Sequence, residues 1–274
     1  MLQFTINRED CIQCGECVAD CPYSIIEMVD GYPAVNEEKA GQCIECQHCF
    51  AICQPGALSI FGLNPADSKP LKGNYPDPSK METLMMGRRS VRRYKKESVE
   101  AELIDRIMET VRTAPTGVNN RSTLYTLVED PVVMAELRAR TYDGLRKLVE
   151  KDALPPGKEF FGGVSNAYEK GVDIIYRGAP HLLVASVPAD GPSPMADALI
   201  GLSYFELLAA SHGVGTVWNG FAKWALLDLV PEAGAMLGIP DTHTIGYMIA
   251  FGKPAVQYHR TVQRSGCVVK RVTI

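Results

Sequence analysis

Apolar positions follow two periodicities, which divide residues 80–274 into predicted helices and strands. Apolar side chains that recur every three or four positions indicate a helix, and short continuous apolar runs between turn residues indicate buried strands. The expected helices begin near Lys80, cover residues 98–113, run from Asp130 to about Leu148, and cover residues 194–211. The expected strands cover residues 124–128, 181–187, 215–218 and 244–251. Helices and strands therefore alternate, which indicates an α/β-type arrangement.

The helix predicted at residues 98–113 has the clearest apolar stripe. Its members are Leu103, Ile104, Ile107, Met108 and Val111. We expect Ser98 to cap this helix and Pro115 to end it. By contrast, Pro155-Pro156-Gly157 begins a segment for which no regular structure is predicted.

A change of composition separates this region from the start of the chain. Residues 64–79 contain four prolines and no periodicity, so they predict an extended linker. With 274 residues, of which 46% are hydrophobic, the chain exceeds one typical domain. The predicted division is a small domain at residues 1–62, a proline-rich linker at 63–80, and a domain with its own core at 81–274.

Eight of the nine cysteines stand in two runs with identical spacing. The first run is Cys11, Cys14, Cys17 and Cys21, and the second, 32 positions later, is Cys43, Cys46, Cys49 and Cys53. Three thiolates at this close spacing can wrap a cubane iron–sulfur cluster, whose fourth ligand must come from elsewhere. Zinc sites usually pair two C-x2-C units, and disulfides belong to oxidising compartments. Iron–sulfur clusters are therefore the favoured interpretation, with zinc and disulfides as the alternatives.

These runs resemble the two-cluster bacterial ferredoxins over about the first 62 residues. The resemblance implies that the fourth cysteine of each run ligates the other cluster. One [4Fe-4S] cluster would be held by Cys11, Cys14, Cys17 and Cys53, and the second by Cys43, Cys46, Cys49 and Cys21. Such clusters would also cross-link and stabilise a domain that is too small to bury much apolar surface. One departure is that the proline follows Cys21 directly, whereas after Cys53 it comes one place later, at Pro55.

Charge is distributed unevenly between the two predicted domains. Residues 1–64 carry two basic and nine acidic side chains, a net charge of -7, while the whole chain carries -4. An acidic electron-transfer module could use this charge to dock a partner, and a merely solvated acidic face is an equal alternative. Nothing in the charge pattern suggests nucleic acid. No apolar run of membrane-spanning length lacks charge, because residues 195–218 carry Asp197, Glu206 and His212.

Cysteine usage and the first residues of the sequence indicate a cytoplasmic protein. The sequence begins MLQFTINRED, without a charged-then-apolar leader, and the cysteine pattern fits a reducing compartment. The ninth cysteine, Cys267, is expected to be a small buried apolar residue.

A basic segment follows the linker and is a candidate anion site. Arg88, Arg89, Ser90 and Arg92 place three guanidinium groups and a hydroxyl within five residues. Guanidinium groups bind phosphate bidentately, so this segment predicts a phosphate or cofactor clamp, with a solvated basic face as the alternative. Three further pieces follow in order: residues 114–119, residues 213–220, and Gly252-Lys253-Pro254 with the later Arg260 and Arg264.

In this order the four pieces resemble the nitroreductase family of FMN-binding flavoproteins, from about Met81 to the end of the chain. The resemblance implies an α+β fold, the α/β/α sandwich of the nitroreductase type, behind a ferredoxin-like domain. It also implies an FMN site. The implied FMN-binding residues are Arg88, Arg89, Ser90 and Arg92, then Pro115, Thr116, Gly117 and Asn119, then Trp218, Asn219 and Gly220, and finally Arg260 and Arg264.

Two departures from the family pattern concern the surroundings of the flavin. Asn119 is followed by Asn120-Arg121-Ser122-Thr123, where the family commonly has Gln-Pro and an aromatic residue. Arg121 would favour an anionic substrate or the reduced flavin, and a surface arginine is the equal alternative. Asn219 stands where an acidic residue is sometimes found beside the flavin N5, and we expect it to act as an uncharged donor.

No residue is predicted to act as an obligate acid or base, because in such proteins the flavin performs the redox chemistry. His48 is expected to be a solvated loop histidine, and the remaining histidines form no catalytic triad. Phe161, Tyr168, Lys223 and Trp224 are expected in the core or at the surface rather than against substrate.

The resemblance implies an iron–sulfur flavoprotein oxidoreductase. Electrons would pass from two [4Fe-4S] clusters to FMN and on to an organic acceptor such as a nitro compound, quinone or activated alkene. The donor would be an external ferredoxin or NAD(P)H. Family membership also implies a homodimer with FMN at the interface, which residues 194–211 would help to bury. The alternative function is an electron-transfer protein that relays electrons between protein partners without a small-molecule substrate.

Overall fold

The computed structural model describes residues 2–264 and 266–273, and they form two compact units. The first unit comprises residues 1–76 and 118–120, and the second comprises residues 77–117 and 121–274. Within the described residues, no helix has the length and apolar character needed to cross a bilayer.

The first unit contains four short strands and two short helices. In chain order these are β1 (Phe4–Ile6), α1 (Glu16–Ala19), β2 (Ile26–Val29), β3 (Tyr32–Val35), α2 (His48–Ile52) and β4 (Leu58–Ile60), with single 3-10 turns η1 (Ala40–Gln42) and η2 (Pro65–Asp67). β1 pairs antiparallel with β4, and β2 pairs antiparallel with β3. The small core of this unit contains Cys17 and Cys49 beside Ile25, Leu58 and Ile60.

The sequence duplication is also visible in the backbone of this unit. Gln13 and Glu45, which are 32 positions apart, have φ angles of 54° and 55°. Gly15 and Gln47, related in the same way, precede α1 and α2 with φ angles of 74° and 60°. Non-glycine residues seldom adopt this left-handed conformation. Its recurrence at both positions shows that each cysteine run folds into the same loop before its helix.

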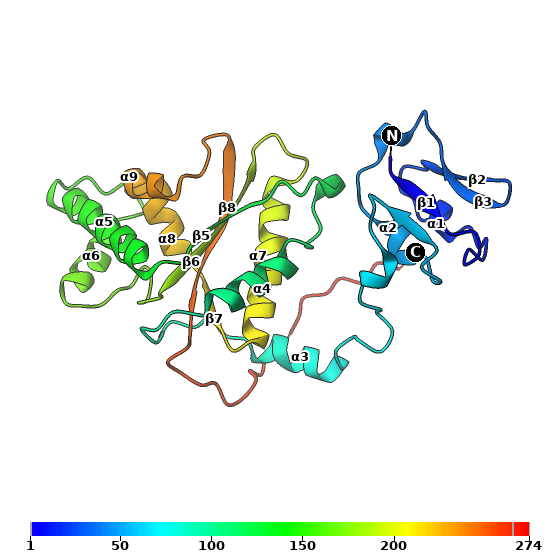
Figure 1. The fold of residues 1–274 in the computed structure, drawn as a ribbon. Helices are drawn as coiled ribbons and strands as arrows, with labels where there is room; N and C mark the ends of the chain where they lie inside the picture. Colours follow the sequence, from blue (N-terminus) through cyan, green and yellow to red (C-terminus); the bar gives the residue numbers. More distant parts are fainter. Residues whose placement is uncertain (1, 265, 274) are drawn as a thin grey trace. The chain divides into compact units, whose positions relative to one another are not determined.

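The second unit is a four-stranded sheet with helices on both faces (Figure 1). Its strands are β5 (Leu124–Val128), β6 (His181–Pro188), β7 (Gly215–Trp218) and β8 (His243–Gly252), in the order β5-β6-β8-β7 and antiparallel throughout. Its helices are α3 (Pro78–Gly87), α4 (Ala101–Val111), α5 (Pro131–Glu150), α6 (Phe161–Glu169), α7 (Pro194–Ser211), α8 (Gly220–Trp224) and α9 (Pro231–Gly234), with short turns η3 (Gly117–Asn119), η4 (Ala225–Leu229) and η5 (Ala235–Leu237).

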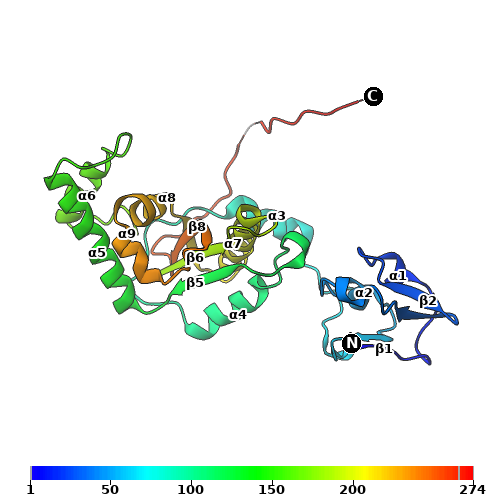
Figure 2. The same cartoon turned by 90° about the horizontal axis from the view of Figure 1, so that it is seen from above.

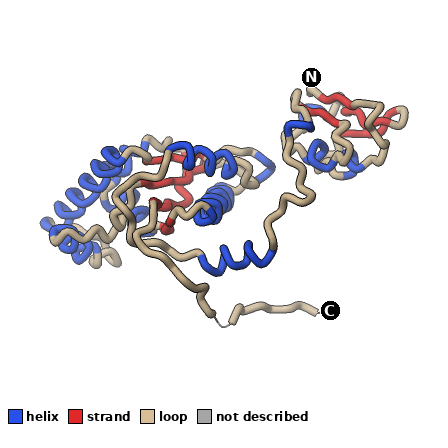
Figure 3. Tube along the Cα trace, turned by 60° about the horizontal axis from the view of Figure 1, so that its bottom comes forward, coloured by secondary structure: helices blue, strands red, loops and turns tan. Residues whose placement is uncertain are grey.

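Alternation along the central strands explains why both faces of the sheet are covered. Leu182 and Val184 of β6 belong to the core beneath α5, α6, α8 and α9, whereas Leu183 and Ala185 belong to the core beneath α4 and α7. Successive side chains of a strand point to opposite faces, so a strand buried on both sides must be apolar at every position. Figures 2 and 3 show the two helical layers with the strands between them. The predicted α+β sandwich is confirmed.

Three expectations about individual elements are wrong. The helix expected from Lys80 begins at Pro78, because the Asp77 carboxylate accepts hydrogen bonds from the backbone N–H groups of Ser79 and Lys80. Ser98 does not cap α4, whose N-cap is Glu100 without a side-chain cap. The segment expected to be irregular after Pro155 contains α6.

Cys267 is also not the buried residue that the sequence suggested. It is exposed, in a segment after β8 without helix or strand. The apolar residues around it, Val268 and Val269, are exposed as well. Local apolar composition predicted burial here, but this segment packs against no core of the described chain.

Candidate functional site

The eight motif cysteines surround two separate cavities of the first unit. Cys11, Cys14, Cys17 and Cys53 line a cavity with an empty volume of about 360 Å³, part of it open to solvent. Cys21, Cys43, Cys46 and Cys49 line a second cavity of about 400 Å³ on the same measure. Each cavity thus takes three cysteines from one run and the fourth from the other run. These are the two sets of four for which the sequence predicts ligation of two clusters, and the ligand assignment stays a prediction.

Helices α1 and α2 carry the most buried thiol of each set. Cys17 is 8% exposed and Cys49 is 7% exposed. Burial, with the neighbouring cysteines adding to it, raises the pKa of Cys17, and burial raises the pKa of Cys49 to about 11. Both side chains are therefore protonated thiols at neutral pH when no metal is bound. Because metals bind the thiolate, occupation of either cavity must release protons.

The arrangement of the cysteines bears on zinc binding and disulfide formation, the two alternatives to an iron–sulfur cluster. All nine cysteines are free thiols in the described structure, and no three of its Cys, His, Asp or Glu side chains converge as ligands of a single metal ion. Each set of four instead surrounds an apolar cavity, as thiolates at the corners of a polynuclear cluster do. Four thiols around one cavity are the donor set that a cubane cluster needs.

His48 lines the second cysteine cavity, next to Cys49. Its Nδ1 is 3.3 Å from Oδ2 of Asp20, and the two side chains are 58% and 44% exposed. A pair so open to solvent contributes little to stability. The exposure agrees with the solvated histidine that the sequence predicted, but His48 begins α2 and does not lie in a loop.

The basic segment after α3 lies along β7, which brings two arginines to a cavity. The Val91 N–H donates to the Thr216 carbonyl at 2.8 Å, and Ser90 forms a parallel bridge with Thr216. A Cβ at Gly215 would lie 2.8 Å from Val91, so a glycine is needed for this close approach. Arg88 and Arg89 both line a cavity with an empty volume of about 830 Å³ on the same measure, part of it open to solvent. The other lining residues come mainly from α3, residues 213–216 and residues 254–258.

The guanidinium groups of this segment differ in what they already bind. Arg88 donates to Glu206 Oε1 at 2.9 Å, whereas Arg89 donates to the Met86 carbonyl at 2.7 Å and has a buried Nε without a partner. Arg92 is exposed and donates to the Ser90 carbonyl at 3.4 Å. A guanidinium carries five N–H donors, so Arg88 and Arg89 both have donors left for an anion in the cavity.

Two carboxylates of α7 hold the segments that carry candidate site residues. Glu206 binds Arg88, and Asp197 accepts a hydrogen bond from the Gly117 N–H at 2.9 Å. Asp197 is 2% exposed, and its Oδ2 has no partner. From the sequence, Asp197 and Glu206 were considered only as charges that argue against a membrane span. Two acids in an otherwise apolar helix were the available signal, because buried charges are kept only with partners.

The turn after α4 holds several of the predicted residues in different surroundings. Pro115 is exposed, and the Thr116 hydroxyl accepts a hydrogen bond from the Arg121 N–H at 2.9 Å. A Cβ at Gly117 would lie 3.0 Å from Pro192, so little space is left there. Asn119 has a φ angle of 55° and groups with the first unit, apart from the other candidate FMN residues.

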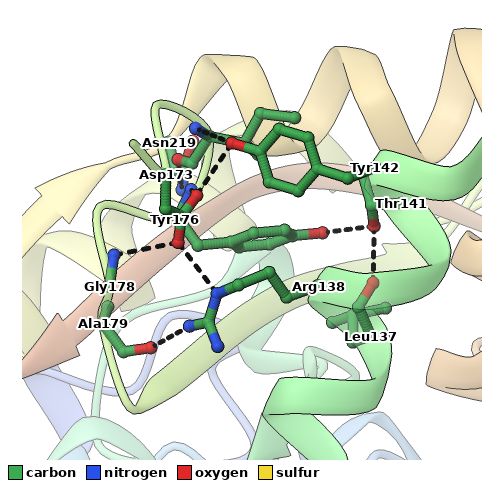
Figure 4. Close-up of polar contacts among 10 residues, drawn as sticks. Leu137, Arg138, Thr141, Tyr142, Asp173, Tyr176, Gly178, Ala179 and Asn219 are labelled. Atoms are coloured by element: carbon green, nitrogen blue, oxygen red, sulfur yellow. Dashed lines mark hydrogen bonds and ion pairs between the residues drawn. The ribbon is translucent and has the colours of Figure 1, made fainter. Parts of the chain in front are cut away.

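The Asn219 side chain, expected to act as an uncharged donor, already has partners within the chain. Asn219 is 4% exposed, its Oδ1 accepts from the Ala222 N–H at 2.9 Å, and its Nδ2 donates to the Ile175 carbonyl at 3.0 Å (Figure 4). The side chain is thus the N-cap of α8 and a link to another loop. The Asn219 N–H and carbonyl are also bonded within the chain, to the Met248 carbonyl and the Lys223 N–H, and the Trp218 ring packs against Tyr247 with centroids 5.3 Å apart.

Arg260 and Arg264 are exposed in the segment after β8 and do not line the arginine cavity. Tyr258 of the same segment does line it. Of the side chains expected in the core or at the surface, Phe161 is fully buried, Tyr168 stacks on Tyr142, and Trp224 is 41% exposed beneath the Lys158 ammonium group.

Comparison with known proteins defines the class of both units. Residues 85–253 match the model of the nitroreductase family, and residues 10–58 match that of the 4Fe-4S dicluster domain. The chain belongs to the nitroreductase family. It is an oxidoreductase of that family with a ferredoxin domain of the 4Fe-4S dicluster type before the family domain.

Individual relatives are distant. A nitroreductase from Bacteroides fragilis, solved with bound FMN, superposes with a TM-score of 0.57 at 22% identity and covers 70% of this chain and 99% of its own, which establishes the fold. An NADH dehydrogenase from Thermus thermophilus is 25% identical over 187 residues, 63% of this chain and 86% of that protein. The RNA polymerase subunit Rpo3 of Methanosarcina acetivorans is 33% identical over 55 residues, so the chain spans 21% of its length.

Proposed function

We propose that the protein is an iron–sulfur flavoprotein oxidoreductase that binds two [4Fe-4S] clusters in its first unit and FMN in its second. Its acceptor is a small organic molecule such as a nitro compound, quinone or activated alkene. The observation that carries the proposal is the division of the eight cysteines into two cavities, each lined by four thiols drawn from both runs.

Each set of four thiols fits the needs of one cluster. Cys11, Cys14, Cys17 and Cys53 would hold the first cluster, and Cys21, Cys43, Cys46 and Cys49 the second. The apolar side chains between them, among them Ile25, Leu58 and Ile60, exclude water from the sulfurs. Exchange of the fourth ligand ties the two halves of the duplication together, which stabilises a unit with a small core.

The arginine cavity supports an FMN phosphate site. Arg88 and Arg89 line it, and the buried Nε of Arg89 lacks a partner, as a donor that awaits an anion would. We assign Ser90, Arg92, Arg260 and Arg264 to the same phosphate region, Pro115, Thr116, Gly117 and Asn119 to the flavin surroundings, and Trp218, Asn219 and Gly220 to its reactive edge. FMN in the structurally similar nitroreductase from Bacteroides fragilis supports this assignment.

The two kinds of cofactor have complementary chemistry: each cluster carries one electron at a time, and FMN can take up one or two. The residues of the chain bind and orient these groups, and none is assigned the role of an acid or base. Trp218 shields one side of the proposed flavin edge, and the buried Asn219 keeps the backbone beside it in place.

The exposed apolar residues of α7 support a homodimer with FMN at its interface. Tyr204 is 41% exposed, and Ile200 and Leu207 on the same side are partly exposed, on a helix whose opposite side is buried in the core. Apolar side chains on both sides of a helix predict a partner on the open side. The electron donor is NAD(P)H or an external ferredoxin, and the similarity to an NADH dehydrogenase favours a test of NADH first.

Anaerobic purification with iron, sulfide and flavin quantified tests this function. The proposal expects about eight iron atoms, about eight sulfides and about one FMN per chain. NADH, NADPH and reduced ferredoxin would then be compared as donors, with nitroaromatic, quinone and enone acceptors. Protein without acid-extractable flavin would contradict the proposal. Reduction of the cofactors without turnover of any small acceptor would instead favour a carrier of electrons between proteins.

A further inference from the structure

Asp173 organises the loop at residues 173–179, which leads into β6 (Figure 4). Its Oδ1 accepts from the Tyr142 hydroxyl at 2.8 Å and from the Tyr176 N–H at 2.9 Å. Its Oδ2 accepts from Arg138 Nε at 2.8 Å and from the Gly178 N–H at 2.9 Å. Four donors from the loop and from α5 therefore converge on one carboxylate, which is 13% exposed. Such a network rigidifies a loop when every member is satisfied.

Tyr142 links this hydrogen-bond network to Ile175 in the same loop. Its hydroxyl donates to Asp173 and accepts from the Ile175 N–H at 2.9 Å. The residue is 3% exposed, and burial raises the pKa of Tyr142, so the hydroxyl keeps the proton that it donates. The position of Ile175 thus depends on a single hydroxyl of α5.

Asn219 connects Ile175 to the end of β7. The Ile175 carbonyl accepts from Asn219 Nδ2 at 3.0 Å, and Asn219 Oδ1 caps α8 through the Ala222 N–H at 2.9 Å. The Asn219 N–H donates to the Met248 carbonyl at 2.8 Å. One buried residue therefore joins the 173–179 loop, α8 and β8. Segment 218–220, which contains it, is the segment proposed to face the flavin.

We propose that Tyr142 and Asp173 are positioning residues, which act through Ile175 and Asn219 to hold the backbone of residues 218–220 against the reactive edge of the flavin. This inference rests on the proposed FMN site. Backbone dipoles influence a redox group only when they are fixed in place before it binds, because their effect falls quickly with distance and misorientation. The network supplies that fixation without any contact of its own with the flavin.

Two tyrosines of the network allow a matched test. Tyr142→Phe removes the hydroxyl that leads to Ile175 and Asn219. Tyr176→Phe removes an equally buried hydroxyl, whose partner is the Thr141 hydroxyl on α5 at 2.8 Å. Tyr142→Phe loses two buried hydrogen bonds and Tyr176→Phe loses one. Urea unfolding of both variants therefore accompanies the binding measurement, because a purely structural role predicts effects that follow the loss of stability. The measurement is the dissociation constant of the full chain for oxidised and for reduced FMN.

We expect Tyr142→Phe to change the ratio of these two dissociation constants about tenfold, a shift of about 30 mV in the two-electron potential of the bound flavin. The flavin absorption bands should shift as well. Tyr176→Phe should leave both the ratio and the bands as in the wild type. Equal effects of the two variants, or a Tyr142→Phe variant with the wild-type ratio, would overturn the inference.

The Asn219→Ser variant tests the same inference independently. Serine is as good an N-cap as asparagine but is too short to reach the Ile175 carbonyl, so the variant keeps the cap of α8 and loses the link. It should change the ratio in the same direction as Tyr142→Phe, and the double variant should show no more than the larger single effect. Additive effects would contradict a shared path. If Tyr142→Phe does not fold, Asn219→Ser is compared with Tyr176→Phe, and the same outcomes support or contradict the inference. A wild type without FMN would refute the proposed function instead.

Discussion

Arg88 and Glu206 are 118 residues apart in the sequence and form an ion pair with 2.9 Å between Nη1 and Oε1. The Glu206 side chain is 10% exposed, and the Thr216 hydroxyl is 3.4 Å from the same oxygen. The pair fixes Arg88 at the mouth of the arginine cavity, but it also neutralises the charge that an anion would meet there. FMN affinity should therefore depend on Glu206, although Glu206 does not line the cavity.

Glu206→Gln should strengthen FMN binding by about 1 kcal/mol, roughly fivefold, the scale of a partly exposed ion pair. Glutamine keeps an acceptor for Arg88 and removes the negative charge that competes with the phosphate. Quenching of FMN fluorescence during titration of the apoprotein measures the change. Glu136→Gln is the matched control, because Glu136 pairs with Arg140 on the exposed side of α5. Unchanged or weaker binding in Glu206→Gln would contradict the phosphate role of Arg88.

Three single cysteine variants distinguish crossed from local ligation. Cys14→Ala and Cys53→Ala should each lose the same cluster, with about half of the iron, and should leave the same electron paramagnetic resonance signal. Cys21→Ala should lose the other cluster and leave a different signal. Cys267→Ala, which removes an exposed cysteine outside both cavities, should keep all of the iron. If Cys21→Ala instead matched Cys14→Ala, and Cys53→Ala differed from both, each run would serve its own cluster.

The stability of the second unit should fall in mild acid because of His181. This residue is fully buried; its Nε2 accepts from the Val99 N–H and its Nδ1 lies 2.9 Å from the Glu129 carbonyl. Burial lowers the pKa of His181 below its usual value of 6.5. As the pH falls below 6.5, the unfolded chain binds a proton that the folded chain excludes, so the free energy of unfolding decreases until the lowered pKa is passed.

Urea unfolding at pH 7.5 and pH 5.5 tests this dependence. Both tryptophans of the chain, Trp218 and Trp224, lie in the second unit, so their fluorescence follows that unit. The loss of stability between the two pH values should be smaller in His181→Gln than in the wild type. The control is His259→Gln, in the exposed segment after β8, which should keep the wild-type loss. An identical loss of stability in all three proteins would show that His181 does not cause it.

Two helical glycines should respond in opposite ways to alanine. A Cβ at Gly144 of α5 would lie 2.3 Å from Val230, so Gly144→Ala should destabilise the second unit by about 1–3 kcal/mol through overpacking. Gly163 of α6 is exposed and has nothing within 4 Å of the added atom. Gly163→Ala should therefore stabilise the unit by about 0.5–1 kcal/mol, the difference in helix propensity. Tryptophan fluorescence in urea measures both, and equal signs would contradict the packing described for Gly144.

Sequence periodicity was sufficient for the elements whose own residues decide them. The predicted bounds of β5, β7 and α7 agree with the structure, and the Asp130 side chain caps α5 as expected. In each case the apolar pattern or a turn residue lies within the element itself. Ser98 failed as a cap, because the helix begins at Ala101, where Glu100 pairs instead with the distant Lys253. Such a choice depends on a partner that no local pattern contains.

The candidate sites show the same difference between what a local pattern predicts and what distant partners decide. The cysteine spacing alone pointed to eight ligands in two sets, because a short repeated loop encodes its own geometry. Only the tertiary structure decided that Asn219 is a buried cap and link, that Glu206 binds Arg88, and that Cys267 is exposed. These outcomes depend on groups from elements far apart in the chain, whose approach is set by the packing of both helical layers on the sheet. The sequence of this protein therefore determines its local chemistry, whereas the fold determines which groups pair with its polar side chains.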